Sequence, residues 1–256
     1  MYKDIRNPLF SEEEYNRMLE FEGERRAFDL DVASFNASSL VSEVSSLTGV
    51  LPSSNGKFKK PENSVGFLFS NVKEIAMNII TQEGGIQWFS DFMTSWIPYK
   101  DNERDLYSES NYKLNVMTKI TFGKLVLKHC EAEIYSKSFA ELKADQEIEG
   151  LYNYANMLNI YIEGLLDSRN MPVFPANDSD GNPQYIPDNC YFMMGDNRFN
   201  SLDLRHDSKR KEKALTTEDP MSVTYHSMMK PQYINKKYII GKPMFRFWPF
   251  DRFGKV

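Results

Sequence analysis

The stretch YIPDNCYFMMGDNRFNSLDLR, residues 185–205, decides how the fold is predicted. Residues 190–194 are apolar or aromatic and suit a pleated, half-buried surface, which predicts a strand. Gly195 ends that strand, because glycine tolerates positive φ and the Asp and Asn that follow bond their own backbone. If the next segment is extended, Ser201, Asp203 and Arg205 point to one side. There the Arg205 guanidinium can hold the Asp203 carboxylate in a fork.

The letters GDNRFNSLDLR, residues 195–205, resemble the signature G-D-N-R-x-x-S-x-D-S-R of type I signal peptidases. The residues just before it, among them Ile186-Pro187 and Tyr191-Phe192-Met193-Met194, match the usual lead-in of that family, and residues 238–256 resemble its closing strand and tail. Leu204 stands where the signature has serine, and the interval from Arg205 to Gly241 is longer than is usual in the family. The geometry around Arg205 is therefore expected to differ from the family's.

The resemblance implies a function and a set of supporting residues. Type I signal peptidases are membrane-bound serine endopeptidases that remove signal peptides from exported preproteins, with a neutral lysine as the base for a serine nucleophile. By resemblance, Ser201 orients that lysine, while Asp203 and Arg205 brace the wall of the site. The alternative is that these residues form only an ordinary turn with a surface ion pair. The implied shell of the active site consists of Gly195, Asp196, Asn197, Arg198, Ser201, Asp203 and Arg205.

The nucleophile and the base themselves are not identified in the sequence. In the family the serine sits in S-M-x-P-T and the lysine in K-R-x-x-G-x-P-G-D, and neither full pattern precedes Gly195. Ser227-Met228 lies on the wrong side of the signature, which favours a plain loop serine over a nucleophile. Lys119 is a candidate buried amine, but the alternation around it favours an exposed strand residue.

The chain is thus expected to be the C-terminal part of a signal peptidase, inactive alone, whose Ser/Lys dyad a separate N-terminal segment supplies. One alternative is a non-catalytic relative that binds extended peptides or a partner at a sheet edge. Another is a soluble α+β domain that matches by coincidence. By family, the protein is placed at the outer face of the bacterial cytoplasmic membrane. No membrane-length apolar run or signal-peptide pattern is found in this chain.

Composition narrows the possible partners. A net charge of −5 provides no basic field for nucleic acid, and 41% hydrophobic residues are enough for a packed core. Neither a cofactor nor a metal is expected, because the run 177–182 lacks the distal glutamate of a calcium loop. Cys130 and Cys190 allow at most one disulfide, and two separate buried thiols are favoured.

Periodicity predicts an α+β fold: a partial antiparallel β core of signal-peptidase type with a large, mostly helical N-terminal insertion. The insertion region is predicted over 1–110 and the β-rich core portion over 111–256. Helices are expected at 11–30, 64–97 and 138–167, and strands at 112–135, 188–194 and 236–249.

Three further expectations concern which segments are exposed and which are buried. Residues 206–220 are charged and predict an exposed loop. The aromatic stripe from Trp88 to Trp96 fits a core face better than a membrane interface, because Lys and Arg are absent there. If strands of another segment complete the sheet, an exposed apolar edge and self-association follow.

Overall fold

The computed structural model describes residues 35–54, 56–97, 106–137, 139–166, 181–182, 185–195, 201–241, 244–248 and 250–255. The contacts divide the chain into two units, each described by itself below. The helical unit contains the described residues up to 166 together with 209–228, and the C-terminal unit contains those of 181–208 and 229–255. The predicted helix 11–30 lies outside the described residues.

The predicted helical region 64–97 is confirmed, and it is divided into three helices. They are α3 (Val65–Ser70), α4 (Val72–Thr81) and α5 (Gly85–Thr94). A preceding helix, α2 (Ala37–Ser46), begins at Asn36, whose side chain accepts a hydrogen bond from the Ser39 N–H. Gly84 has φ of 89°, and a Cβ on Gly85 would collide with the backbone of Ile79. Two glycines therefore permit the close turn from α4 into α5.

The largest correction concerns α6 (Leu106–Ile134), a single helix where alternation predicted strands over 112–135 and a turn at Gly123. Residues 114–123 are all buried, which is nearly three helical turns without an exposed position. A helix that is buried all round lacks a polar face, so its sequence carries no 3.6-residue apolar stripe. The alternation over part of it is therefore not evidence of a strand.

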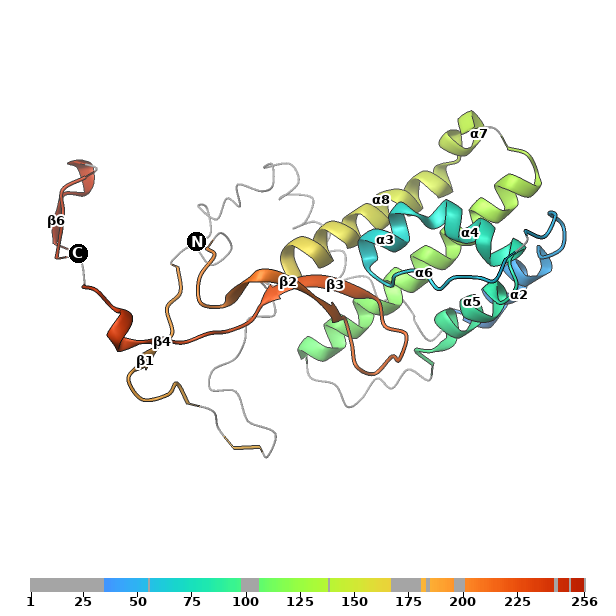
Figure 1. Cartoon of the computed structure of the whole chain (residues 1–256). Coiled ribbons are helices and arrows are strands. Elements are labelled where there is room, and N and C mark those ends of the chain that lie inside the picture. Colours follow the sequence, from blue (N-terminus) through green and yellow to red (C-terminus); the bar gives the residue numbers. More distant parts are fainter. Residues whose placement is uncertain are drawn as a thin grey trace. The chain divides into compact units, whose positions relative to one another are not determined.

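The predicted helix 138–167 is confirmed over its described part. It consists of α7 (Phe139–Ala144), α8 (Gln146–Ile160) and a π-helical segment η1 (Tyr161–Leu165). Asp145 begins α8 by accepting hydrogen bonds from the N–H groups of Glu147 and Ile148. In the helical unit α8 packs along α6, and α4 packs on α6 as well (Figure 1).

The strands that the structure describes are short and pair two by two. The pairs are β1 (Cys190–Tyr191) with β4 (Ile234–Asn235), β2 (His206–Ala214) with β3 (Thr224–Met229), and β5 (Phe245–Arg246) with β6 (Gly254–Lys255). Two 3-10 turns, η2 (Lys236–Tyr238) and η3 (Phe250–Arg252), interrupt the C-terminal segment. The predicted strands 188–194 and 236–249 are each confirmed at two residues only. Helices and short antiparallel strands agree with the α+β class, while a larger core of signal-peptidase type stays a prediction.

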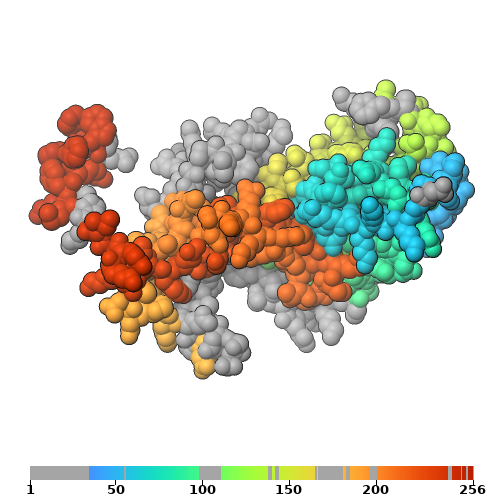
Figure 2. All heavy atoms as spheres, viewed as in Figure 1, coloured from blue at the N-terminus to red at the C-terminus, as the bar shows by residue number. Residues whose placement is uncertain are grey.

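The aromatic stripe lies inside the helical unit. Trp88, Phe92 and Trp96 are at most 4% exposed, and the rings of Trp88 and Phe92 stack with centroids 5.1 Å apart. The core interpretation is thus confirmed for these side chains. In Figure 2 the atoms of α3 and α4, in cyan, form much of the visible surface of this unit. Cys130 and Cys190 are both free thiols, as expected; Cys130 is buried, but Cys190 is partly exposed, which corrects the expectation of two buried thiols.

Candidate functional site

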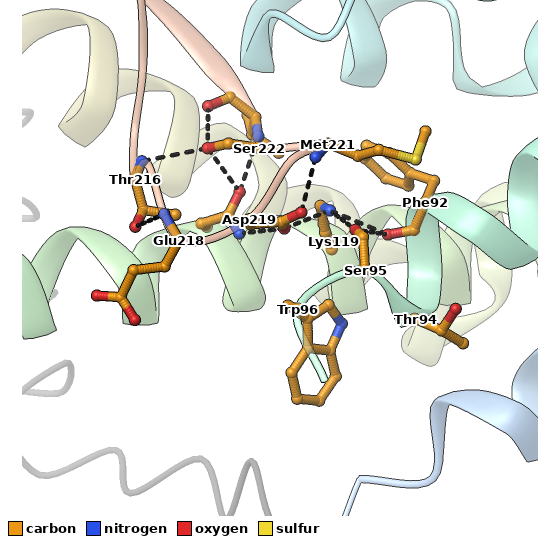
Figure 3. A network of polar contacts seen from close by, with 12 residues as sticks. Phe92, Thr94, Ser95, Trp96, Lys119, Thr216, Glu218, Asp219, Met221 and Ser222 are labelled. Atoms are coloured by element: carbon orange, nitrogen blue, oxygen red, sulfur yellow. Dashed lines mark hydrogen bonds and ion pairs between the residues drawn. The ribbon is translucent and has the colours of Figure 1, made fainter. Parts of the chain in front are cut away.

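A buried lysine in the middle of α6 organises the polar contacts of the helical unit. Lys119 Nζ donates to Ser95 Oγ at 2.8 Å, to the Phe92 carbonyl at 3.0 Å and to Asp219 Oδ2 at 2.5 Å (Figure 3). The ammonium group thereby uses all three of its N–H bonds. Its side chain is 0% exposed, as is that of Asp219. The predicted exposed strand residue is therefore a fully buried helical one, which corrects the expectation for Lys119.

Ser95 is placed by the end of α5. It is the C-cap of that helix, and its N–H donates to the Asp91 carbonyl. Its hydroxyl donates to the Phe92 carbonyl at 3.2 Å and accepts from Lys119. Unlike Lys119, Ser95 is partly exposed. A partly exposed serine thus contacts a fully buried lysine through its hydroxyl.

Asp219 comes from the loop 215–223, between β2 and β3. Its Oδ2 also accepts from Asn115 Nδ2 at 2.8 Å, and its Oδ1 accepts from the Met221 N–H at 2.9 Å. Asn115 in turn accepts from the Val223 N–H at 2.7 Å. Asn115 and Lys119 are four residues apart on α6 and so share one helix face, to which the loop is bound at both residues.

This loop corrects another expectation. The sequence predicted an exposed solvated loop over 206–220. Exposure is confirmed for residues 208–214, but the structure forms β2 over His206–Ala214 and buries Leu215 and Asp219, each 3% exposed. The physical reason is the pairing of Asp219 with Lys119 and Asn115, partners about a hundred positions earlier. Ser227, predicted as a loop serine, is 2% exposed and lies in β3.

Burial tunes the protonation of the cluster. Burial lowers the pKa of Lys119 from its ordinary 10.5 to about 8, and the charge and hydrogen bond of Asp219 oppose that effect without cancelling it. Burial acts to raise the pKa of Asp219, but the charge and hydrogen bond of Lys119 outweigh it and keep that pKa below its ordinary value. Asp219 is therefore ionised at neutral pH, while Lys119 titrates close to neutral pH.

The predicted fork is present in the C-terminal unit. Arg205 Nε donates to Asp203 Oδ1 at 2.8 Å and Arg205 Nη2 donates to Asp203 Oδ2 at 2.9 Å. The Gly195 N–H donates to Asp203 Oδ2 at 2.8 Å, so the fork also fixes the turn. Burial acts to raise the pKa of Asp203, but the hydrogen bonds from Arg205 and Gly195 overcome it and lower that pKa to about 2. The Arg205 side chain is 1% exposed.

Four of the residues in the implied shell are thus described and lie together. Gly195, Ser201, Asp203 and Arg205 form one cluster, in which a Cβ on Gly195 would lie 2.5 Å from Ser201 Cβ. The other three implied residues, Asp196, Asn197 and Arg198, lie outside the described residues. The roles that the resemblance assigns to this cluster stay predictions.

Sequence reasoning missed Ser95 and Asp219. A signal for the first existed: Ser95-Trp96-Ile97-Pro98 keeps the serine and proline of S-M-x-P-T, and Lys119 with Gly123 keeps the lysine and first glycine of K-R-x-x-G. Their order, serine before lysine before GDNR, is also that of the family. Both patterns are incomplete in this chain, which is why the sequence alone did not identify these residues. Asp219 had no signal, because it stands in an otherwise ordinary charged stretch.

Comparison with known proteins gives a partial similarity. The chain is 29% identical over 97 residues to signal peptidase I of Bacillus caldolyticus. This match covers 38% of the chain and 40% of that relative's length. No family model and no solved structure matches the chain. The similarity therefore supports a relationship to signal peptidase I over part of the chain.

None of the described helices combines the length and apolarity that a membrane crossing needs. The described residues also contain no group of three or more His, Cys, Asp or Glu side chains that is suited to a metal ion.

Proposed function

We propose that the chain carries a Ser/Lys hydrolase site of the signal-peptidase kind, with Ser95 as nucleophile and Lys119 as general base. The observation that carries this proposal is the 2.8 Å contact between Lys119 Nζ and Ser95 Oγ. A hydroxyl is a weak nucleophile at neutral pH and needs an adjacent base, and a lysine serves as one when burial lowers its pKa. The pKa of about 8 leaves roughly one Lys119 in ten neutral at pH 7.

The proposed reaction is an acyl transfer. The Ser95 hydroxyl turns from the Phe92 carbonyl to neutral Lys119 Nζ and gives up its proton as Oγ bonds to the carbonyl carbon of the scissile peptide. The resulting ammonium returns that proton to the leaving amine, which leaves an ester on Ser95. A water molecule then loses a proton to Lys119 and attacks the ester; the bond from the acyl carbon to Ser95 Oγ breaks, the carboxyl product leaves, and Lys119 returns the proton to Oγ. Ser95, a partly exposed residue, supplies the nucleophilic oxygen, and the burial of Lys119 keeps the amine out of water.

The substrate and location follow from the partial relationship. The substrates would be preproteins with small residues before the cleavage site, processed at the outer face of the bacterial cytoplasmic membrane. Within the C-terminal unit, the Asp203–Arg205 fork would hold the turn at Gly195 in place through its hydrogen bond from the Gly195 N–H. The chain spans about 40% of the length of the curated relative that it matches, so the whole activity of that relative is part of the proposal.

The test is cleavage of a fluorogenic peptide with an Ala-x-Ala site by the full chain. We compare wild type with Ser95→Ala, Ser95→Cys and Ser90→Ala; Ser90 is a matched serine within α5, the helix that Ser95 caps. Cleavage that Ser95→Ala abolishes, Ser95→Cys partly retains and Ser90→Ala leaves unchanged supports the proposal. Absence of cleavage by wild type, or cleavage that survives Ser95→Ala, overturns it.

A second candidate is a non-catalytic relative that binds extended peptides. It is favoured by exposed apolar side chains beside two-residue strands of the C-terminal unit: Phe245 is 52% exposed and Trp248 is 65% exposed. Backbone pairing with such a strand would add affinity, and aromatic contacts would add specificity. This candidate predicts peptide binding by wild type and Ser95→Ala with the same affinity, and cleavage by neither.

A further inference from the structure

We propose that Asp219 is a positioning residue for the Ser95/Lys119 pair: its carboxylate holds Lys119 in the ammonium form and aims Nζ at Ser95. This inference rests on the proposed function and adds a third residue to it. Asp219 belongs to the loop 215–223, which lies outside the two motif stretches, residues 185–205 and 238–256, that carry the resemblance.

Geometry makes Asp219 the dominant charge around the amine. Lys119 Nζ has three hydrogen-bond acceptors. Asp219 is charged, whereas Ser95 Oγ and the Phe92 carbonyl are neutral. The Phe92 ring lies 4.4 Å from Nζ and adds a cation–π contact. The acids on the helices packed against α6 are exposed or partly exposed rather than turned into this cluster: Glu43, Glu74, Asp91, Glu147, Glu149 and Glu163.

The carboxylate is itself fixed from two sides. Asn115 Nδ2 holds Oδ2, the same oxygen that accepts from Lys119, and the Met221 N–H holds Oδ1. The loop is closed by the Leu215 N–H donating to the Val223 carbonyl at 2.9 Å. An acceptor held this firmly restrains the long lysine side chain, which would otherwise have several rotamers to sample.

The arrangement has a chemical consequence. A full negative charge 2.5 Å from Nζ favours the ammonium form, whereas a general base must be neutral when it receives the Ser95 proton. Asp219 therefore sets the pH at which the pair becomes competent, in addition to aiming the amine. Its own charge does not change during the reaction, because the proton moves between Ser95, Lys119 and the leaving amine without passing to Asp219.

The experiment uses the full chain with Asp219→Asn, Asp219→Glu and, as control, Glu218→Gln. Glu218 is exposed, and Figure 3 shows its carboxylate pointing away from Lys119. Cleavage is measured from pH 5.5 to 10, and the Lys119 amine is titrated by NMR with ¹⁵N-labelled lysine. We expect Asp219→Asn to lower the pKa of Lys119 and to move the acid limb of the cleavage profile down by about one pH unit. At pH values below the acid limbs of both proteins, cleavage by Asp219→Asn, relative to its own maximum, should then be about ten times that of wild type. Glu218→Gln should leave both readouts unchanged, and Asp219→Glu should keep the wild-type limb.

The two readouts separate the failure of this inference from the failure of the proposed function. A Lys119 pKa that Asp219→Asn leaves unchanged, in a folded protein, overturns the role of Asp219 even if cleavage is observed. A lowered pKa without cleavage in any variant overturns the proposed function and leaves the electrostatic role of Asp219 supported. If Asp219→Asn does not fold, Asp219→Ser also removes the charge with a smaller side chain, and the same lowering of the Lys119 pKa is expected; no shift overturns the inference.

Discussion

Replacement of Lys119 by methionine tests whether the buried ion pair stabilises the helical unit as its geometry implies. Methionine keeps the length and apolar stem of lysine but leaves the Asp219 carboxylate buried without its cation. Breaking a buried pair by removal of one partner costs about 3–5 kcal/mol. Asp219→Asn removes the other charge, so the buried ammonium keeps only neutral acceptors, among them Ser95 and the Phe92 carbonyl.

The double variant decides between an ion pair and two independent packing positions. With both charges absent, no uncompensated charge remains in the core, so the combined loss should be smaller than the sum of the single losses. For side chains in direct contact we expect a coupling free energy of about 1–3 kcal/mol. Lys124→Met, an exposed lysine on the same helix, is the control and should change stability by less than about 0.5 kcal/mol.

The pH dependence of the unfolding free energy provides a second, independent quantity to measure. In the unfolded chain Lys119 keeps its proton up to its ordinary pKa of 10.5, but in the folded protein it loses that proton above a pKa of about 8. Between these values the unfolded state binds more protons, so the stability of wild type relative to Lys119→Met rises with pH. The rise is at most about 3 kcal/mol, from 2.5 pKa units at 1.36 kcal/mol each.

Urea unfolding at pH 7.5 and at intervals to pH 10.5, followed by tryptophan fluorescence, measures both the coupling free energy and the pH dependence of the unfolding free energy. Trp88 and Trp96 in the core of the helical unit contribute to that signal. Single losses below about 1 kcal/mol, strictly additive in the double variant, would refute the reasoning. A wild-type stability that falls between pH 8 and 10.5 relative to Lys119→Met would refute the assignment of the lowered lysine pKa.

Three further outcomes are expected. Gly123→Ala should destabilise the helical unit by about 1–3 kcal/mol in urea unfolding, because its Cβ would lie 2.7 Å from Leu40 and Met93 atoms, although alanine favours helices; a gain in stability would contradict that packing. Gly195→Ala should reduce amide protection around the Asp203 fork in hydrogen exchange, and Ser201→Gly added to it should restore protection by removing the colliding Cβ; an inert Gly195→Ala would disprove the close approach. Acidification should leave the Gly195 amide protected above pH 4 and expose it as pH falls through the Asp203 pKa of about 2, since a lowered carboxyl pKa stabilises the folded state above its ordinary 3.8; loss of protection already at pH 5 would contradict the assignment.

Several features of this protein follow from local sequence alone. The apolar stripe that runs through α4, the glycine pair before α5 and the capping residue Asp145 each act within a few positions, so propensity and periodicity predict their helices. The Asp203–Arg205 fork is also local, because two residues at alternate positions in an extended segment face the same side. The partial similarity to signal peptidase I agrees with the motif that contains this fork.

Tertiary structure alone decided the rest, and the physical reason is burial by partners distant in sequence. Residues 114–123 mix apolar and polar side chains without an apolar stripe of helical period. They are buried on all sides of the helix because other helices and the loop 215–223 surround them. Lys119 is a solvated charge by local pattern and becomes a buried amine through Asp219, one hundred positions away. Its contact with Ser95, 24 positions earlier, likewise exists only after α5 packs on α6. The sequence therefore determined the local helices and the fork, whereas the fold brought the serine, lysine and aspartate together.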